Sequence, residues 1–462
     1  MSPAPEGRRE FGVDSRALAM SDYVYILESH LSPEQNRVVE EFRKIAAHAN
    51  VNLFLTGGAM RDMLAGSRIR DLDFVVEGPA LKLAKSLAEQ HGVKILSLDE
   101  ANRTAELLFP GGVTAELSAT RRERHKPAKA SASPATIQED LRSRDFTCNA
   151  VALSLSRASR GLLLDPTNGL ADIEHRELRA INTYGFYDDP SRLLRLTRFQ
   201  VRLGFTIDER TRMQVANARE AEVEKNIPAK ALGEELKRIC LEDAPSEIFK
   251  ALEDAGLLAL FNPALSGPKV NLPGIAKVEK NAKLLPDDAR TRAAHLGPAL
   301  YALTEKLNAK ERQALIKTTA LSKADVDLWQ KLESRSKKLE TALRSARIRK
   351  ASQVYRIVSV AAPDEVLFLL YHSPQRQVQE RLRNYYQKYL VTVQEITPEE
   401  WATVEGKPGT PKYAKAREDF IANRLDRRVK KPPAQPEVPP PPPPPPPSSW
   451  TTPQTAMARR AR

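Results

Sequence analysis

The sequence predicts a small α/β head at the N-terminal end, followed by an all-α neck and body and a disordered proline-rich tail. Three observations predict this organisation. Strand-like and helix-like hydrophobic patterns alternate as far as about residue 117. From about residue 137 to residue 425, apolar residues instead recur at spacings of three and four, which is typical of helices. The tract Pro439–Pro447 then excludes a packed core from the last segment.

The composition limits the class of protein. The chain has 462 residues, 41% of them hydrophobic, which is enough for about two to four domains. Its net charge of +13 favours an anionic partner, of which nucleic acids and membrane surfaces are the usual ones. No apolar run approaches the roughly 18 residues of a transmembrane helix, and the charged N-terminus does not resemble a secretory signal. Because two cysteines make a disulfide framework implausible, we expect a reducing, cytoplasmic setting.

The expected elements of the head follow in order. Ser32 as N-cap and Pro33 at the first helical position predict a helix over 33–48. The other predicted elements are strands over 51–55, 71–76, 93–96, 104–109 and 112–117 and helices over 59–64 and 81–91, with the later strands antiparallel. Residues 1–30 are expected to form a flexible leader, and residues 119–136 a mobile loop.

Two glycines and two aspartates carry the most informative pattern in the chain. Gly57 and Gly58 remove side chains where a strand turns into a helix, so that backbone N–H groups can approach a triphosphate. Arg61, one turn further on, adds a planar charged donor. Asp71 and Asp73 share one face of their strand, and paired carboxylates of this kind suit Mg²⁺ with phosphates completing its coordination. The alternative is a structural turn with a solvated Asp pair.

A third carboxylate is usual in two-metal sites. Glu116, in the strand predicted over 112–117, is the best candidate, unless it faces outward at a sheet edge. Further along, Arg144 and Asp145 are placed to orient the sugar or phosphates of a nucleotide, or to form a structural ion pair. Thr147 is expected to cap an apolar helix that follows them.

A basic helix is predicted to begin at Pro190, and its arginines recur every three residues as Arg192, Arg195 and Arg198. They form a band, which on an ordinary surface helix would be a solvated face. The sharper interpretation uses Asp189 and Arg192, neighbours at i and i+3. The carboxylate would accept from the amine of cytosine or adenine and repel the carbonyl of uracil or guanine. Such a pair would select C and A without a template.

These three segments resemble, in order, motifs of the class II tRNA nucleotidyltransferase and bacterial poly(A) polymerase family, within the DNA polymerase β-like superfamily. The resemblance runs from about Val51 to Leu260. It implies a polymerase β-like mixed sheet with helices in the head. It also implies that triphosphate and metals are bound by Gly57, Gly58, Arg61, Asp62, Asp71 and Asp73, that the ribose and triphosphate are contacted by Arg144, Asp145 and Asn149, and that the base is read by Asp189, Arg192, Arg195 and Arg198. Ser143 replaces the first arginine of the second motif, and Asp188 replaces the usual Glu of the third.

The resemblance implies a template-independent transferase that adds C and A to tRNA 3′ ends from CTP and ATP, with two Mg²⁺ ions, and that binds RNA but neither DNA nor a membrane. A poly(A) polymerase acting on mRNA ends and a non-catalytic RNA-binding protein are the alternatives. The expected divisions are a leader over 1–30, a catalytic head over 31–160, a neck over 161–265, an RNA-binding body over 266–428 and a tail over 429–462. The oligomeric state is left open.

Overall fold

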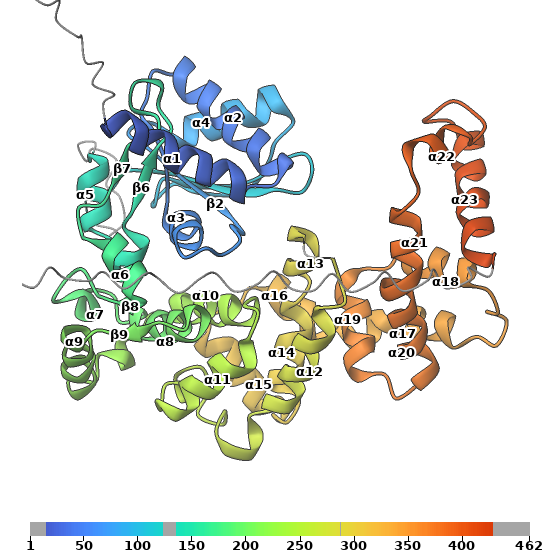
Figure 1. Ribbon diagram of the computed structural model, residues 1–462. Helices are drawn as coiled ribbons and strands as arrows, with labels where there is room; N and C mark the ends of the chain where they lie inside the picture. The colour runs from blue at the N-terminus through green and yellow to red at the C-terminus, as the bar shows by residue number, and fades with distance from the viewer. Residues whose placement is uncertain (1–14, 123–134, 287, 428–462) are drawn as a thin grey trace, which may run out of the picture.

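The computed structural model describes residues 15–122, 135–286 and 288–427. In these residues, a head built on one seven-stranded sheet lies against a long series of helices (Figure 1). The predicted division into an α/β head and an all-α remainder is therefore confirmed in outline. Most of the loop expected at 119–136 and all of the tail expected at 429–462 lie outside the described residues.

The sheet of the head is mixed, and its strands lie in the order β3-β4-β5-β2-β1-β6-β7. The strands are β1 (Leu53–Thr56), β2 (Leu72–Val76), β3 (Lys94–Asp99), β4 (Thr104–Leu108), β5 (Thr114–Ala119), β6 (Ala152–Ser154) and β7 (Leu163–Leu164). Strands β2 and β5 pair in parallel, whereas the other neighbours pair antiparallel. The antiparallel pairing expected for the later strands is confirmed for β3–β4 and β4–β5.

Helices cover one face of the sheet and leave part of the other face open. The head helices are α1 (Ser15–His30), α2 (Pro33–His48), α3 (Gly57–Leu64), α4 (Ala80–His91) and α5 (Ile137–Arg142). Phe42 of α2 and Leu87 of α4 share a core cluster with Leu72 and Phe74 of β2. Because side chains alternate along a strand, Asp73 lies on the opposite face, which is turned toward the neck.

Two expectations about the head are wrong. Helix α1 occupies the second half of the predicted leader, and its Leu27 is buried in the head core, so these residues are structured. Strands β6 and β7 lie beyond residue 137, where the hydrophobic spacing predicted helices, and β6 hydrogen-bonds to β1 inside the sheet. Their three and two residues are too short to show an alternating pattern.

The neck and body are helical apart from a two-stranded sheet of β8 (Glu177–Leu178) and β9 (Thr206–Ile207). The neck helices are α6 (Gly169–His175), α7 (Gly185–Asp188), α8 (Arg192–Leu203), α9 (Glu209–Glu220), α10 (Ala229–Cys240) and α11 (Pro245–Asp254). The body helices are α12 (Leu272–Ala282), α13 (Ala289–Ala293), α14 (Leu296–Thr304), α15 (Ala309–Thr318), α16 (Lys323–Gln330), α17 (Leu332–Arg344), α18 (Ala351–Val358), α19 (Pro363–His372), α20 (Arg376–Asn384), α21 (Leu390–Gln394), α22 (Pro398–Ala402) and α23 (Pro411–Asp426).

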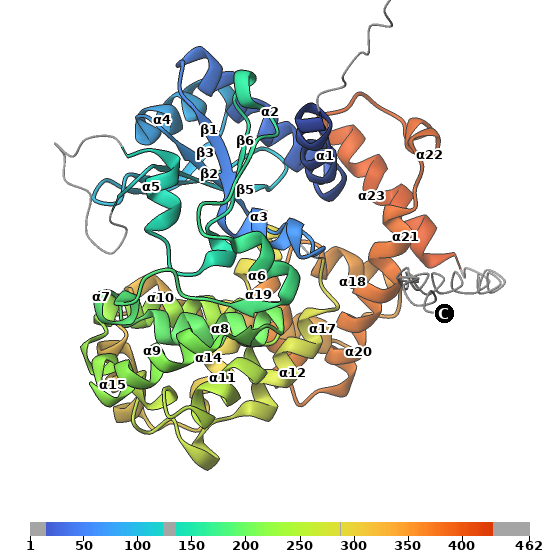
Figure 2. The same ribbon diagram turned by 60° about the vertical axis from the view of Figure 1, so that its left-hand side comes forward.

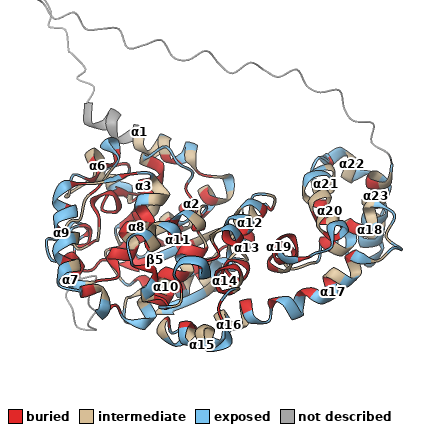
Figure 3. Cartoon of the chain, turned by 90° about the horizontal axis from the view of Figure 1, so that it is seen from below, coloured by how far each residue is buried: buried red, intermediate tan, exposed pale blue. Residues whose placement is uncertain are grey.

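One large core joins the neck to the first body helices. It contains Phe199 of α8, Leu236 of α10, Leu300 of α14 and Leu367 of α19, so the division expected near residue 265 does not separate two cores. Figure 3 shows buried residues gathered in these central helices, whereas α22 and α23 at the far end carry few. No helix among the described residues has the length and apolar character needed to cross a membrane.

Candidate active site

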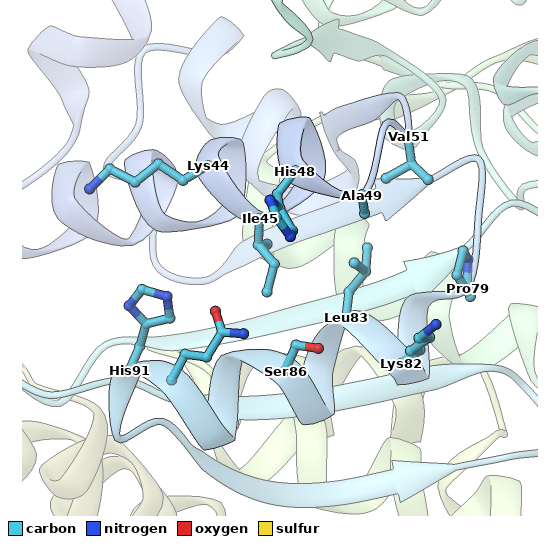
Figure 4. Close-up of a pocket in the computed structure, with 11 residues that line it drawn as sticks. Lys44, Ile45, His48, Ala49, Val51, Pro79, Lys82, Leu83, Ser86 and His91 are labelled. Carbon is cyan, nitrogen blue, oxygen red and sulfur yellow. The ribbon is translucent and has the colours of Figure 1, made fainter.

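A single cleft collects every residue for which the sequence predicted a catalytic, metal-binding or nucleotide-binding role. It has a volume of about 1370 Å³ and is lined by residues from the open face of the head sheet and from helices α8 and α10 of the neck. Figure 2 shows these two helices below the head sheet. A second cavity, of about 620 Å³, lies between α2 and α4 on the covered face (Figure 4). It contains none of the predicted residues, and neither an aspartate nor a glutamate lines it. The cleft is therefore the candidate active site.

Three carboxylates lie together on the head side of the cleft. Asp71 directly precedes β2, Asp73 lies within it, and Glu116 of β5 is the register partner of Asp73 in the parallel pair. The Thr114 hydroxyl donates to Asp71 over 3.1 Å. Burial, together with repulsion from Glu116 and Asp71, raises the pKa of Asp73 to about 7. The expectation that Glu116 joins the aspartate pair thus agrees with the register.

The carboxylates suit a cation that brings other ligands with it. Asp73 is destabilised as an anion by its two acidic neighbours, and a bound cation would relieve that repulsion. In the described part of the chain, no group of three or more acidic, histidine or cysteine side chains is arranged to hold a metal ion. Magnesium commonly binds through one or two carboxylates, and substrate phosphates complete its octahedron. A magnesium site of this kind therefore does not need three protein ligands.

The glycine turn brings backbone close to these carboxylates. Gly57 has a φ of +63°, and a Cβ there would lie 2.9 Å from Oδ2 of Asp73. The Gly58 N–H donates to the same oxygen over 2.8 Å, at the start of α3. The pair of glycines therefore fixes one carboxylate oxygen of Asp73. Triphosphate binding by this turn stays a prediction.

Arg61 and Arg144 are held by the protein itself. Arg61 is buried, and it donates from Nε and Nη2 to Asp62 and from Nη1 to Asn149. Arg144 donates to the Asp140 carboxylate over 3.0 Å and to the Thr56 hydroxyl over 3.0 Å. Both guanidinium groups are therefore hydrogen-bonded to neighbouring side chains in the wall of the cleft. Their contacts with a nucleotide stay predictions. The structural ion pair left open for Arg144 does form, but its partner is Asp140.

The segment after Arg144 differs from the expected apolar helix. Thr147–Asn149 is a single 3₁₀ turn that leads into β6, and the Thr147 hydroxyl donates to Asp172 over 2.6 Å instead of capping a helix. Asp145 turns toward the neck and accepts from Arg195 over 2.9 Å. Burial would raise the pKa of Asp145, but Arg195 outweighs that effect and holds the pKa well below its usual range.

Helix α8 begins at Arg192, two residues later than predicted, because the turn at Asp189–Ser191 forms first. Oδ1 of Asp189 accepts from the backbone N–H and the hydroxyl of Ser191. Oδ2 of Asp189 lies 3.7 Å from Nε of Arg192, and that buried Nε has no hydrogen-bond partner among the described residues. Both side chains line the cleft with hydrogen-bonding capacity left over, which agrees with a base-reading role.

The other arginines of the predicted band are neutralised by Glu235 of α10 and by Glu242, which follows that helix. Glu235 accepts from Arg195 over 3.3 Å and from Arg198 over 3.1 Å, and Glu242 accepts from Arg198 over 2.9 Å. Burial alone would raise the pKa of Glu235, but Arg198 and Arg195 outweigh it and lower that pKa to about 2. Direct contacts of Arg195 and Arg198 with a nucleotide stay predictions.

Sequence reasoning missed acidic residues in and beside the cleft: Glu106 and Glu242 line it, and Glu235 lies beside it, paired with Arg195 and Arg198. Glu235 lies on α10 and Glu242 lies two residues beyond its end, and both accept from Arg198. Glu106 of β4 is the register partner of Glu116, and burial raises its pKa. The place of Glu106 beside Glu116 depends on the strand register, which the sequence alone does not show.

Comparisons with known proteins agree with this geometry. Residues 53–179 match the model of the poly A polymerase head domain. The chain is 38% identical over 199 residues to the A-adding tRNA nucleotidyltransferase of Aquifex aeolicus, covering 43% of this chain and 24% of that one. It is 32% identical over 298 residues to the CC-adding tRNA nucleotidyltransferase of Deinococcus radiodurans, covering 64% of this chain and 76% of that one.

A solved structure supports the same fold. The complex of a CCA-adding enzyme with CTP aligns with a TM-score of 0.50 at 22% identity, over 88% of this chain and 95% of that one. By contrast, the chain covers only 24%, 29% and 56% of the lengths of three A-adding relatives, from Aquifex aeolicus, Geobacter sulfurreducens and Halalkalibacterium halodurans. The coverage of the Deinococcus radiodurans relative, together with the head-domain match and the ordered motifs in one cleft, leads to one conclusion: the chain belongs to the tRNA nucleotidyltransferase family.

Proposed function

We propose that this protein is a template-independent nucleotidyltransferase that adds C and A, as CCA or part of it, to tRNA 3′ ends. The observation that carries the proposal is the arrangement of the cleft. Carboxylates suited to metal and triphosphate, Asp71, Asp73 and Glu116, face a selective pair, Asp189 and Arg192, across one cavity. The activities for which the A-adding and CC-adding relatives are named support the same substrates.

The chemistry follows from these positions. The RNA 3′-hydroxyl gives its proton to solvent as its oxygen forms a bond to the α-phosphorus, the bond from the α-phosphorus to the bridging oxygen breaks, and pyrophosphate leaves with that oxygen. Asp71 and Asp73 would hold Mg²⁺, with Glu116 beside them, and bound Mg²⁺ would supply charge neutralisation at the phosphates. Gly58 keeps Asp73 in place through its N–H, so one metal ligand is oriented before substrate arrives.

Base selection would use the opposite wall. The free Oδ2 of Asp189 would accept from the exocyclic amine of cytosine or adenine, and Arg192 would donate to the neighbouring ring acceptor. Uracil and guanine carry a carbonyl where that amine would be, so the carboxylate would repel them. The nucleotides that fit both groups are CTP and ATP.

A poly(A) polymerase acting on mRNA is the second candidate, because the matching head model is named for that activity. A non-catalytic RNA-binding protein is disfavoured, because Asp71 and Asp73 are both present in the cleft. A cytoplasmic location, where tRNA and mRNA are processed, fits the two buried free thiols, Cys148 and Cys240.

One assay separates the candidates. Purified protein is given tRNA lacking its 3′ CCA, tRNA that ends in CC, or an unrelated RNA with a free 3′ end, with Mg²⁺ and each nucleoside triphosphate singly or in mixture. Addition of a few C and A residues to tRNA supports the proposal. A long A tail on either RNA supports the poly(A) alternative, and no incorporation at all would refute catalysis.

A further inference from the structure

The head and the neck are joined at the wall of the cleft by a ring of charged side chains that all line it. We define this ring as Asp62 and Arg70 of the head with Arg202 and Glu242 of the neck. Nη2 of Arg202 lies 2.8 Å from Oδ2 of Asp62, and Nε of Arg202 lies 3.6 Å from Oε2 of Glu242. The same Oε2 lies 3.3 Å from Nη1 of Arg70. Asp62 and Arg70 are linked by the backbone between them, so the contacts and the backbone together form a closed ring.

The ring connects the two walls on which the proposed reaction depends. Arg70 is the neighbour of Asp71 in the chain, so it sits at the start of the strand that carries the metal-binding carboxylates. Arg202 lies on α8, the helix that begins with Arg192. Glu242 follows α10 and also accepts from Arg198 of α8 over 2.9 Å. A change in the ring would therefore move the metal-binding wall relative to the base-reading wall.

The side chains of the ring are largely shielded from solvent, so their ion pairs favour one relative position of the head and the neck. The Asp62 and Glu242 side chains are each 6% exposed, and Arg202 is 18% exposed. Ion pairs of this kind add little net stability because desolvation offsets their attraction, but they penalise arrangements in which a charge is left unpaired. Burial and the nearby Arg61 lower the pKa of Arg202, so this guanidinium depends on its acidic partners.

Resting on the proposed function, we infer that Arg70, Arg202 and Glu242 are positioning residues that set the spacing between the metal site and the base-reading pair. They act by holding β2 and α8 in one relative position. Without the ring the chemistry would survive, but the base and the α-phosphate would no longer be aligned together, and nucleotide selectivity would fall.

The test compares Arg70→Gln and Arg202→Gln with a matched control. Arg212 and Glu209 form an exposed ion pair within α9, at 3.2 Å, that bridges no elements, so Arg212→Gln removes a comparable contact away from the cleft. Incorporation of all four nucleotides into tRNA is measured for each variant. The ring variants should lose selectivity for C and A by at least about threefold, which is near the lower end of the range for coupled residues. The double variant should lose less selectivity than the product of the two single losses. Arg202→Lys should restore part of the selectivity.

A second measurement is independent of activity. Cysteines replacing the exposed Lys85 of α4 and Lys250 of α11 carry spin labels on the head and the neck, and their distance distribution is recorded. It should broaden in Arg70→Gln and Arg202→Gln and stay unchanged in Arg212→Gln. Wild-type selectivity with an unchanged distribution in the ring variants would overturn the inference. An inactive wild-type protein would instead contradict the proposed function, and the distance measurement would still test the ring.

Discussion

Replacing Asp189 with alanine should damage the choice of nucleotide more than it damages transfer itself. Two parts of the Asp189 carboxylate have separate tasks. Oδ1 accepts from Ser191 and closes the turn before α8, whereas Oδ2 remains available toward the cleft, 3.7 Å from Arg192. Alanine removes both the cap and the acceptor, so the two contributions must be told apart.

The expected magnitudes differ between the two contributions. Losing a charge-assisted hydrogen bond to the amine of C or A costs about 1.5–3 kcal/mol, or roughly 10- to 160-fold in incorporation. UTP and GTP lose the repulsion of the carboxylate at the same time, so their incorporation should fall less or rise. Loss of the turn contact costs about 1 kcal/mol of stability and is common to all four nucleotides.

A matched variant isolates the stability contribution. Asp208 caps α9 by accepting from the backbone N–H groups of Arg210 and Thr211, and it does not line the cleft. Asp208→Ala should therefore lower the melting temperature while keeping selectivity. The assay is single-turnover incorporation of each nucleotide by folded Asp189→Ala and Asp208→Ala protein. If Asp189→Ala still refuses UTP and GTP as the wild type does, the base-reading role is refuted.

Four further expectations follow from the same structure. Asp71→Ala or Asp73→Ala should abolish incorporation and leave tRNA binding nearly intact; activity within about tenfold of wild type, or 1.4 kcal/mol of barrier, would contradict the metal assignment. Affinity for tRNA should fall as salt rises, through counterion release, and a flat titration would argue against a basic RNA-binding surface. Gly57→Ala, at a φ of +63° and against Asp73, should cost about 1–2 kcal/mol in strain and most of the activity, whereas Gly66→Ala, at a φ of +71° in open space, should cost only the strain. The pKa of Glu235 falls from its model-compound value of 4.5 to about 2, so its stabilising effect is present above about pH 4.5 and is lost as the pH falls toward 2; the urea midpoints of wild type and Glu235→Gln should converge over that window and not outside it.

Local patterns in the sequence predicted which residues lie together in the cleft. The turn at Gly57 and Gly58, the aspartates one strand period apart and the arginines of α8 are all short-range features, and the structure places them in one cleft. The boundaries of α8 were less accurate, because the Asp189 side chain bonds to Ser191 and delays the helix. That competition between a side chain and the backbone is a local effect that spacing alone does not reveal.

Features that depend on distant pairing were not predictable in the same way. Strand β6 is stabilised by hydrogen bonds to β1, about a hundred residues earlier in the chain, and its own three residues carry no alternating signal. The neutralisation of Arg195 and Arg198 likewise depends on how α10 packs beside α8. Sequence spacing identified the charges, but only the packing shows which of them are satisfied by protein partners.

The core that runs from α8 to α19 has a consequence for how this chain comes apart. A backbone carbonyl of Thr319 would lie 2.1 Å from a Cβ at Gly233, so α10 and the end of α15 touch with no space between them. Neck and early body should thus melt as one cooperative unit, separate from the head core. A fragment ending at the neck would expose the apolar side chains that pack against the body helices in the shared core. Helices α21–α23 contribute no residue to that core, so their length and shape can change without loss of the neck and early body.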